Sequence, residues 1–153
     1  MLMWRGRTMT PRQELVLAAL AAGESSSELS PVQAQKLFFL IDKNVSGPLG
    51  GEQFDFKPYD YGPFDSAVYA DLDWLSLPDE NCIEIVRSGR YRTYRLTKRG
   101  REIGIQRLAQ LDEQTQSYLA RAKDWVKSLS FQALVRAIYQ AYPETRANSI
   151  FRG

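Results

Sequence analysis

The sequence predicts a mainly α-helical protein with a small β-hairpin, arranged as a winged-helix-like core that C-terminal helices extend. Three segments with helical spacing of apolar residues come first, a hairpin pattern follows them, and two further helical segments complete the chain. The 153 residues are 44% hydrophobic and 25% charged, which is the composition of a soluble protein long enough to bury a core. We therefore predict a single domain over residues 1–153.

The first two helices are predicted from one repeated start signal. Thr10 and Ser30 are each followed by a proline and, three positions after the cap, by a glutamine. This is the pattern of a capped helix start. Gly23 is a plausible stop for the first helix. Residues 37–41 make the second helix apolar enough to be central, and the glycines and proline of residues 44–51 then predict a loop.

Residues 54–77 predict a rigid platform around which the rest of the chain is organised. The alternation Phe-Asp-Phe at residues 54–56 is typical of a half-buried strand. Pro63 is expected in the first turn of a helix over about residues 64–76, and Pro78 is expected to end it. A strand, an aromatic turn and a helix in so short a stretch leave little freedom for the turn between them.

A basic hairpin is predicted to follow. Apolar residues alternate on both sides of Gly89, which is free to adopt positive φ at the turn. Residues 87–101 contain seven basic residues and no acidic one. Such a basic wing can contact phosphate groups, helped by Tyr91 and Tyr94, or its arginines can simply protect an edge strand from aggregation.

Two C-terminal helices complete the prediction. Thr97 can cap a long helix from Lys98 to about Lys127, although Gly100 and Gly104 weaken its first turns. A last helix is expected to start at Ser130 and to end at the proline of residues 142–143. If the protein is a gene regulator, the long helix is the expected homodimer contact.

No catalytic constellation is predicted. The chain has no histidine and one cysteine, Cys82, which excludes histidine-dependent triads and zinc sites of the His/Cys type. Cys82 is expected to be a buried, inert thiol. Five carboxylates follow neither an EF-hand spacing nor a paired arrangement, so a solvated acidic face is expected for them; they are Asp55, Asp60, Asp65, Asp71 and Asp73. We therefore predict no enzyme activity, no cofactor and no metal site.

The sign of the charge on the third predicted helix favours a protein partner over DNA. That helix contains Asp65, Asp71 and Asp73 and no basic residue, although it is the helix that a helix-turn-helix protein places in the major groove. Residues 54–80 contain seven acidic residues and a single lysine, against the basic hairpin that follows. Opposite charges on two faces orient a protein partner, while the net charge of +2 is too small to imply nucleic-acid binding by itself.

A cytoplasmic location without membrane contact is expected. A single cysteine cannot form an intrachain disulfide, which fits a reducing compartment. No apolar run approaches the roughly 18 residues that a membrane span needs. Residues 1–10 are basic but lack the apolar core of a signal peptide.

Short motifs in the chain resemble a known family. Residues 35–40 (QKLFFL), residues 61–63 (YGP) and the Val-Tyr at 68–69 with Leu72 are similar to the Panacea domain, typified by the SocA-like antitoxins, and to related uncharacterised bacterial proteins. The similarity covers about residues 30–100, and the glycine-rich loop before the platform does not match it. The Tyr-Pro-Glu at residues 142–144 and the Asn-Ser at 148–149 are similar to the C-terminal end of some of those proteins.

The resemblance implies neutralisation of a toxin by direct protein contact, in some members with delivery of that toxin to a protease. It does not imply catalysis. Five residues match the family pattern, either as partner contacts or as structural residues: Lys36, Tyr61, Gly62, Pro63 and Tyr69.

Two hypotheses follow, each with its own residues. In the first, the protein is a non-catalytic interaction module, antitoxin-like, whose partner-binding residues are Lys36, Tyr59, Asp60, Tyr61, Gly62, Pro63, Asp65 and Tyr69. For the two tyrosines that flank Asp60, an exposed binding site and a structural turn are both open. In the alternative, a winged-helix transcriptional regulator binds DNA through Arg87, Arg90, Arg92, Arg95, Lys98, Arg99 and Arg101.

Overall fold

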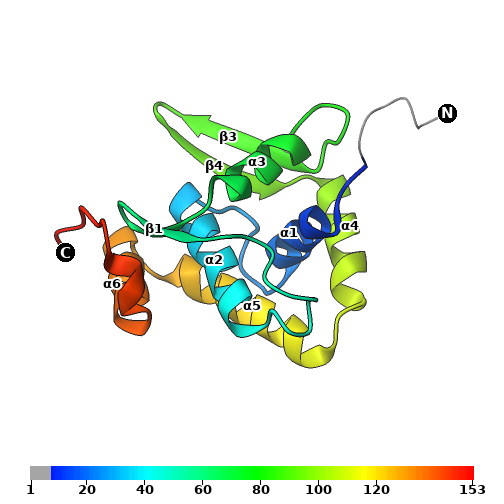
Figure 1. The fold of residues 1–153 in the computed structure, drawn as a ribbon. Helices are drawn as coiled ribbons and strands as arrows, with labels where there is room; N and C mark the ends of the chain where they lie inside the picture. The colour runs from blue at the N-terminus through cyan, green and yellow to red at the C-terminus, as the bar shows by residue number, and fades with distance from the viewer. Residues whose placement is uncertain (1–7) are drawn as a thin grey trace.

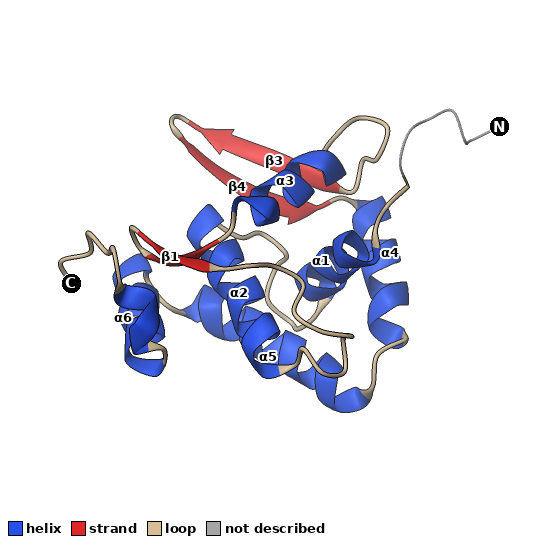
Figure 2. Cartoon of the chain, in the orientation of Figure 1, coloured by secondary structure: helices blue, strands red, loops and turns tan. Residues whose placement is uncertain are grey.

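The computed structural model describes residues 8–153, and it is mainly α-helical over that range. Residues 1–7, most of the basic stretch for which no signal peptide is predicted, lie outside the described residues. Figures 1 and 2 show the elements in chain order: α1 (Pro11–Ala21), α2 (Pro31–Asn44), β1 (Lys57–Tyr59), β2 (Gly62–Phe64), α3 (Ser66–Leu75), β3 (Ile83–Ser88), β4 (Tyr91–Leu96), α4 (Lys98–Ala109), α5 (Glu113–Ser128), α6 (Phe131–Ala141) and the short 3-10 helix η2 (Pro143–Arg146). Within these residues, six α-helices surround a core and two separate antiparallel hairpins flank it.

The helix starts predicted at Thr10, Ser30, Thr97 and Ser130 are confirmed. Each hydroxyl accepts a hydrogen bond from the main-chain N–H three residues further along the chain. At Thr10 and Ser30 the glutamine side chain also accepts a hydrogen bond from the main-chain N–H of the cap residue, which completes a capping box. These N–H groups have no partner inside the helix, so the caps determine where each helix begins.

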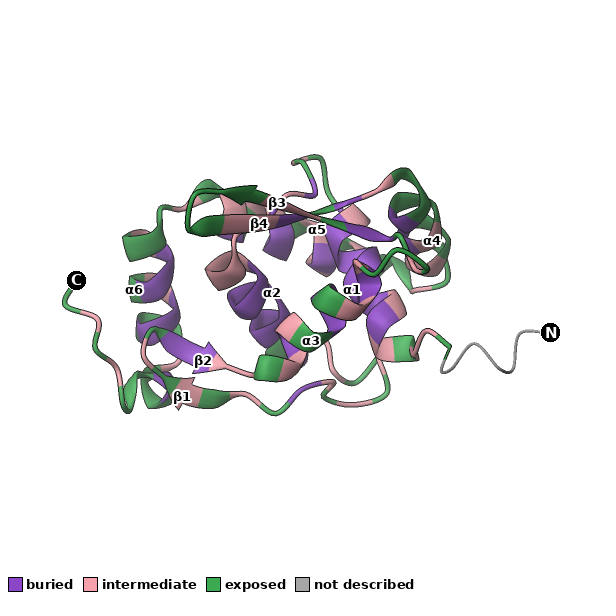
Figure 3. Ribbon diagram, turned by 90° about the horizontal axis from the view of Figure 1, so that it is seen from above, coloured by how far each residue is buried: buried purple, intermediate pink, exposed green. Residues whose placement is uncertain are grey.

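The core lies between α1, α2 and α5. Residues 16–20 of α1 are fully shielded from solvent, as are Leu37 of α2 and Leu119 of α5. Figure 3 places the buried residues of α1 and α2 at the centre, with the β3–β4 hairpin along one side and α3 with the β1–β2 hairpin along the other. The prediction of a central second helix is therefore confirmed. No helix within residues 8–153 combines the length and apolar character that crossing a membrane requires.

The hairpin predicted around Gly89 is confirmed. Gly89 adopts a φ of +62°, and β3 pairs with β4 from Ile83–Leu96 at the base to Ser88–Tyr91 at the tip. Leu29, just before α2, forms an isolated bridge with Tyr94 on the other side of β4. Cys82 at the base of β3 is buried, as expected, and burial raises the pKa of its thiol.

Two predictions for the platform are wrong. The strand expected at residues 54–56 lies three residues later, as β1, because the N–H of Phe54 donates to the carboxylate of Asp42 at 2.9 Å instead of joining a ladder. The rings of Phe54 and Phe56 pack against phenylalanines of α2, although residues 54–56 form no strand. Pro63 lies in β2 and not in a helix. The helix begins later, as α3, with Asp65 as its cap.

The long helix predicted from Lys98 to Lys127 is two helices. α4 ends at Ala109 and α5 starts at Glu113, with Asp112 as the cap of the second helix. Its carboxylate accepts a hydrogen bond from the N–H of Thr115 at 3.0 Å. The break turns the chain, so that α4 packs on α1 while α5 packs on α2.

The two glycines of α4 permit close packing, which differs from the weakening role predicted for them. A Cβ atom at Gly100 would lie 2.0 Å from the carbonyl oxygen of Cys82, and one at Gly104 would lie 2.4 Å from that of Leu17. Both distances are far shorter than any real contact. Here the loss in helix propensity is accepted in exchange for close approach of two backbones.

Candidate functional site

Buried polar side chains of α2 hold the main chain of residues 53–65, where the platform begins. Asp42 is 4% exposed and accepts hydrogen bonds from the N–H groups of Gln53 and Phe54, both at 2.9 Å. Gln35 is 1% exposed and bonds both main-chain groups of Asp65, donating to its carbonyl oxygen and accepting from its N–H, each at 3.0 Å. Because buried polar groups need partners, these bonds fix the shape of a segment with little regular structure.

Lys36 lies beneath the platform turn. Its side chain is buried, its Nζ donates to the carbonyl oxygen of Pro63 at 3.3 Å, and burial lowers the pKa of its amine to about 8. Gly62, at a φ of +104°, passes directly over it, and an added Cβ atom would lie 3.4 Å from that Nζ. Lys36, Gly62 and Pro63 are all buried, so they shape the turn from below and are shielded from contact with another molecule.

The turn displays two tyrosines. Tyr59 is 53% exposed and Tyr61 is 39% exposed, and they flank the tip of the β1–β2 hairpin. The carbonyl oxygen of Asp60 between them accepts hydrogen bonds from the N–H of Ile150 at 3.0 Å and the hydroxyl of Ser149 at 3.2 Å. The C-terminal segment therefore steadies the turn from the side. The ring of Tyr59 packs on Phe64 at 5.1 Å and that of Tyr61 on Phe131 at 5.2 Å, and the rest of each side chain is exposed.

Asp65 and Tyr69 are anchored within the protein. The carboxylate of Asp65 accepts from the N–H groups of Ala67 at 2.9 Å and Asp55 at 2.8 Å, so it caps α3 and ties it to the platform. Tyr69 is half-buried, with its ring centre 5.6 Å from that of Phe64, and burial raises the pKa of its phenol. Of the eight predicted partner-binding residues, Tyr59 and Tyr61 are the ones classed as exposed.

The expectation of a solvated acidic face is wrong for Asp71. This residue is 3% exposed and its two carboxylate oxygens lie 2.6 and 3.1 Å from the guanidinium of Arg12, with Gln13 donating a third bond at 3.1 Å. The hydrogen bond to Asp71 raises the pKa of Arg12 above its ordinary value. Asp65 is half-buried as the cap of α3. Of the three aspartates predicted for this helix, Asp73 is therefore the exposed one. The surface of α3 is thus less acidic than predicted, although it contains no basic residue.

The seven basic residues of the wing do not form one patch. Arg87, Arg90 and Arg92 lie near the tip of the β3–β4 hairpin, whereas Lys98, Arg99 and Arg101 lie in the first turn of α4 at its base. A strand of six residues separates them, which spans about 20 Å. Arg95, between the two groups, forms ion pairs with Glu84 at 2.9 Å and Glu28 at 3.9 Å on the outer face.

Arg92 joins the hairpin to the aromatic residues of the platform. Its Nε donates to the hydroxyl of Tyr94 at 2.7 Å, and its guanidinium lies 5.4 Å from the ring centre of Tyr69 and 5.5 Å from that of Tyr94. The bond to Tyr94 raises the pKa of Arg92 above its ordinary value. Ring contacts continue from Tyr69 through Phe64 to Tyr59, at 5.6 and 5.1 Å.

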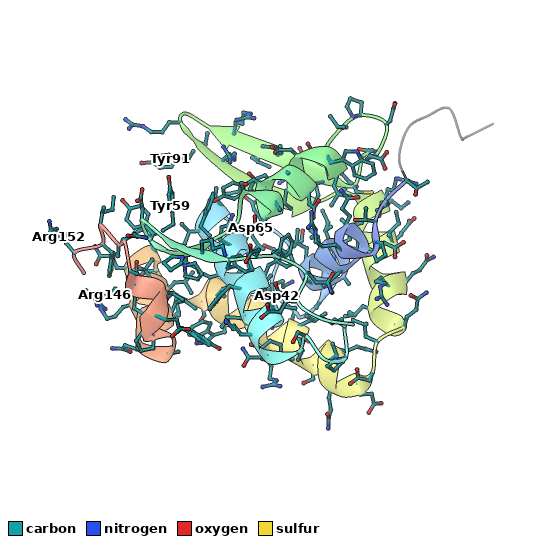
Figure 4. All side chains as sticks on the ribbon, viewed as in Figure 1. Asp42, Tyr59, Asp65, Tyr91, Arg146 and Arg152 are labelled. Carbon is teal, nitrogen blue, oxygen red and sulfur yellow. The ribbon has the colours of Figure 1, made fainter. Side chains whose placement is uncertain are left out.

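The two hairpin tips therefore place aromatic and basic side chains at one end of the molecule, where ring contacts join Arg92 to Tyr69 of α3 and on to Tyr59. We call this region the hairpin surface and define it by Tyr59, Tyr61, Tyr69, Arg87, Arg90, Tyr91 and Arg92. Figures 1 and 3 show both tips at the same end of the molecule, near the C-terminus, and Figure 4 shows Tyr59 and Tyr91 extending from them there. Tyr91 is 74% exposed.

Sequence reasoning missed Gln35 and Asp42 as supports of the platform. They stand seven residues apart, on one face of an otherwise apolar helix. That spacing is the signal that could have found them, because a polar residue on a buried face needs a partner. Within residues 8–153, no group of three or more histidine, cysteine or acidic side chains is placed to hold a metal ion.

Comparison with known proteins identifies no relative: no family model, curated protein or solved structure matches the chain. The resemblance to the Panacea domain therefore depends on the short motifs of residues 35–40 and 61–72, with those of residues 142–144 and 148–149.

Proposed function

We propose that the protein is a non-catalytic interaction module that binds a protein partner through the hairpin surface. The observation that supports this most strongly is the exposure of Tyr59, Tyr61 and Tyr91 on hairpins that buried residues hold in place. Tyrosine and arginine are the residues that protein interfaces favour, because they offer large contact areas at little cost in side-chain freedom. A platform already fixed in the free protein further lowers the cost of association.

The chain order supports a winged-helix-like core for this module. Three helices precede the β3–β4 hairpin, and the bridge between Leu29 and Tyr94 joins the segment between α1 and α2 to that hairpin. The resemblance to SocA-like antitoxins makes a toxin the first candidate partner. On this proposal Lys36, Gly62 and Pro63 preserve the turn, and the tyrosines beside it contact the partner.

Site-specific photo-crosslinking tests the proposal. A photoreactive phenylalanine analogue placed at Tyr59 or Tyr91 should crosslink to one protein in cells of the native host. The matched control is Ile105 of α4, which is 51% exposed and lies outside the hairpin surface. Crosslinks from Ile105 to the same protein at equal yield, or crosslinks from none of the three positions, would contradict the proposal.

DNA binding by a winged-helix regulator is the second candidate. The three arginines at the wing tip favour it, as do Arg146 and Arg152, which Figure 4 places at the same end of the molecule. The absence of basic residues from α3 weighs against it, because that helix would face the duplex. Charge reversal at Arg90 and Arg92 should abolish retention on immobilised duplex DNA, and unchanged retention would remove the idea. A homodimer remains a proposal for either function, but the split between α4 and α5 removes the single long helix expected to form it.

A further inference from the structure

Two arginines of the hairpin surface face each other across the strands, and neither forms an ion pair with a described residue. Arg87 and Arg92 are directly opposite each other in the β3–β4 register. Tyr94 exchanges both of its main-chain hydrogen bonds with Leu29, at 2.8 and 2.9 Å, so its N–H and C=O point away from β3. Main-chain groups two residues apart on a strand point to the same side, so the N–H and C=O of Arg92 also point away from β3. Arg87 and Arg92 are therefore a non-hydrogen-bonded pair. In such pairs the Cα atoms are only about 4.5 Å apart and the side chains lie closest.

Like charges at directly opposite positions destabilise a hairpin. Among the described residues, neither Arg87 nor Arg92 forms an ion pair. The same hairpin does pair opposite charges elsewhere, since Glu84 faces Arg95 across the strands at 2.9 Å. The carboxylate that acts on Arg92 through space is that of Asp73 in α3, which makes no ion pair with it. Neither guanidinium of the opposed pair is therefore neutralised by an ion pair among the described residues.

The guanidinium of Arg92 is also held ready for a ligand. Its Nε is fixed by the hydroxyl of the fully buried Tyr94, and two rings pack against it. Its two terminal nitrogens make no hydrogen bond to the described residues. A guanidinium with one edge fixed and the other available binds an oxyanion with little loss of side-chain freedom.

We propose that Arg87 and Arg92 together bind a side-chain carboxylate from an acidic segment of the protein partner. This inference rests on the proposed function and names the chemistry of the partner. Tyr69 and Tyr59 continue the surface beside the pair, so the acidic segment also presents apolar atoms to these rings. A carboxylate fits better than a nucleic-acid backbone, because a row of phosphates would pass the exposed Asp73. The cations at the base of the hairpin, in the first turn of α4, lie about 20 Å away.

Titration of the arginine side chains with a defined probe tests the proposal. Acetylated, amidated tetraglutamate is added to the 15N-labelled protein, and the Nε–H resonances of Arg87 and Arg92 are followed by NMR. We expect saturable shifts of both resonances, no shift with tetraglutamine, and a loss of affinity of about tenfold or more in Arg87→Gln. The matched control, Arg101→Gln, removes an exposed arginine of α4 and should keep the affinity of the wild type.

Two other anions, inorganic phosphate and a short DNA duplex, distinguish a carboxylate ligand from a phosphate ligand. Binding of inorganic phosphate or of a short DNA duplex in preference to tetraglutamate would overturn the proposal in favour of a nucleic-acid ligand. An equal loss of affinity in Arg101→Gln would also overturn it, because the binding would then depend on net charge alone.

A stability measurement does not depend on any ligand. If the guanidinium groups of Arg87 and Arg92 repel each other in the free protein, Arg87→Gln should raise its melting temperature by about 1–3 °C. About 0.5 M NaCl should stabilise the wild type more than this variant, because salt screens the repulsion. A lower melting temperature in Arg87→Gln would contradict the proposal. Crosslinks from Tyr59 and Tyr91 without tetraglutamate binding would leave the proposed function standing and remove this inference. Tetraglutamate binding without any crosslink would show that the arginine pair binds carboxylates but would remove the protein partner, and the inference with it.

Discussion

Replacing Lys36 with methionine should stabilise the protein at neutral pH, and this gain in stability should disappear at high pH. Burial moves the pKa of the amine from 10.5 to about 8. At about 1.4 kcal/mol per pH unit, keeping Lys36 charged in the folded state costs on the order of 3 kcal/mol at pH 7. Methionine fills a similar volume without a charge, but it leaves the carbonyl oxygen of Pro63 without its 3.3 Å hydrogen bond, a loss of about 1 kcal/mol. The net expected gain in the free energy of unfolding is about 2 kcal/mol.

The dependence on pH identifies the cause. Between about pH 8 and 10.5 the folded protein releases the Lys36 proton while the unfolded chain still binds it, so the stability of the wild type rises through this window. The advantage of Lys36→Met should therefore fall from about 2 kcal/mol at pH 7 to about zero at pH 10. Lys123, whose burial also lowers its pKa to about 8, contributes to the curves of both proteins and cancels in their difference.

Urea unfolding followed by circular dichroism at pH 7, 8.5 and 10 measures this difference. Lys98→Met is the matched control, since Lys98 is exposed on α4, and its free energy of unfolding should stay close to that of the wild type. A Lys36→Met protein that is less stable than the wild type by the same amount at all three pH values would refute the reasoning. The bond to Pro63 would then outweigh the cost of burying the charge.

Two further predictions concern the packing that positions the site, and both are checked by urea unfolding at pH 7. Asp42→Asn leaves one of the two platform N–H groups without an acceptor and should lower the free energy of unfolding by about 1–3 kcal/mol; the exposed Asp55→Asn should leave the unfolding midpoint unchanged, and equal effects would remove the proposed role of Asp42. Gly100→Ala places a Cβ atom 2.0 Å from the carbonyl oxygen of Cys82 and should cost about 3 kcal/mol or more. Gly47→Ala is its control, because no atom lies within 4 Å of the added Cβ; a Gly100→Ala variant as stable as this control would show that α4 and β3 separate easily.

Local signals in the sequence were sufficient for most of the helices and for the hairpin around Gly89. The caps at Thr10, Ser30, Thr97 and Ser130 and the turn at Gly89 were predicted because each depends on residues within a few positions of one another. The break at Asp112 is also local, and its side chain bonding the N–H of Thr115 is a helix-start signal that the sequence analysis missed.

The platform was predicted less well because its bonds span long separations in sequence. The N–H of Phe54 turns away from a ladder to a carboxylate on α2, and the partner of Asp71 is 59 residues away on α1. Neither partner can be identified from residues 54–77 alone. The position of Asp71 did offer a clue, since it stands three residues after Val68 and four before Leu75, on the apolar side of α3. A carboxylate at such a position indicates a buried ion pair.

The candidate surface differs from the prediction in which of its residues are exposed and in its charges. Tyr59 and Tyr61 are exposed as the partner-binding hypothesis requires. The surface of α3 is less acidic than predicted, because Asp71 is buried. The opposed pair of Arg87 and Arg92 and the rings around Arg92 depend on strand register and on the position of α3, which composition and spacing do not give.

Amide hydrogen exchange of the free protein tests most directly whether α2 holds the platform ready for a partner. The N–H groups of Gln53, Phe54 and Asp65 lie outside regular helices and strands, yet each donates to a buried or partly buried side chain of α2. If that account is right, these three amides exchange as slowly as those in the middle of α2. Exchange as fast as that of the exposed Glu52, which directly precedes them, would contradict it.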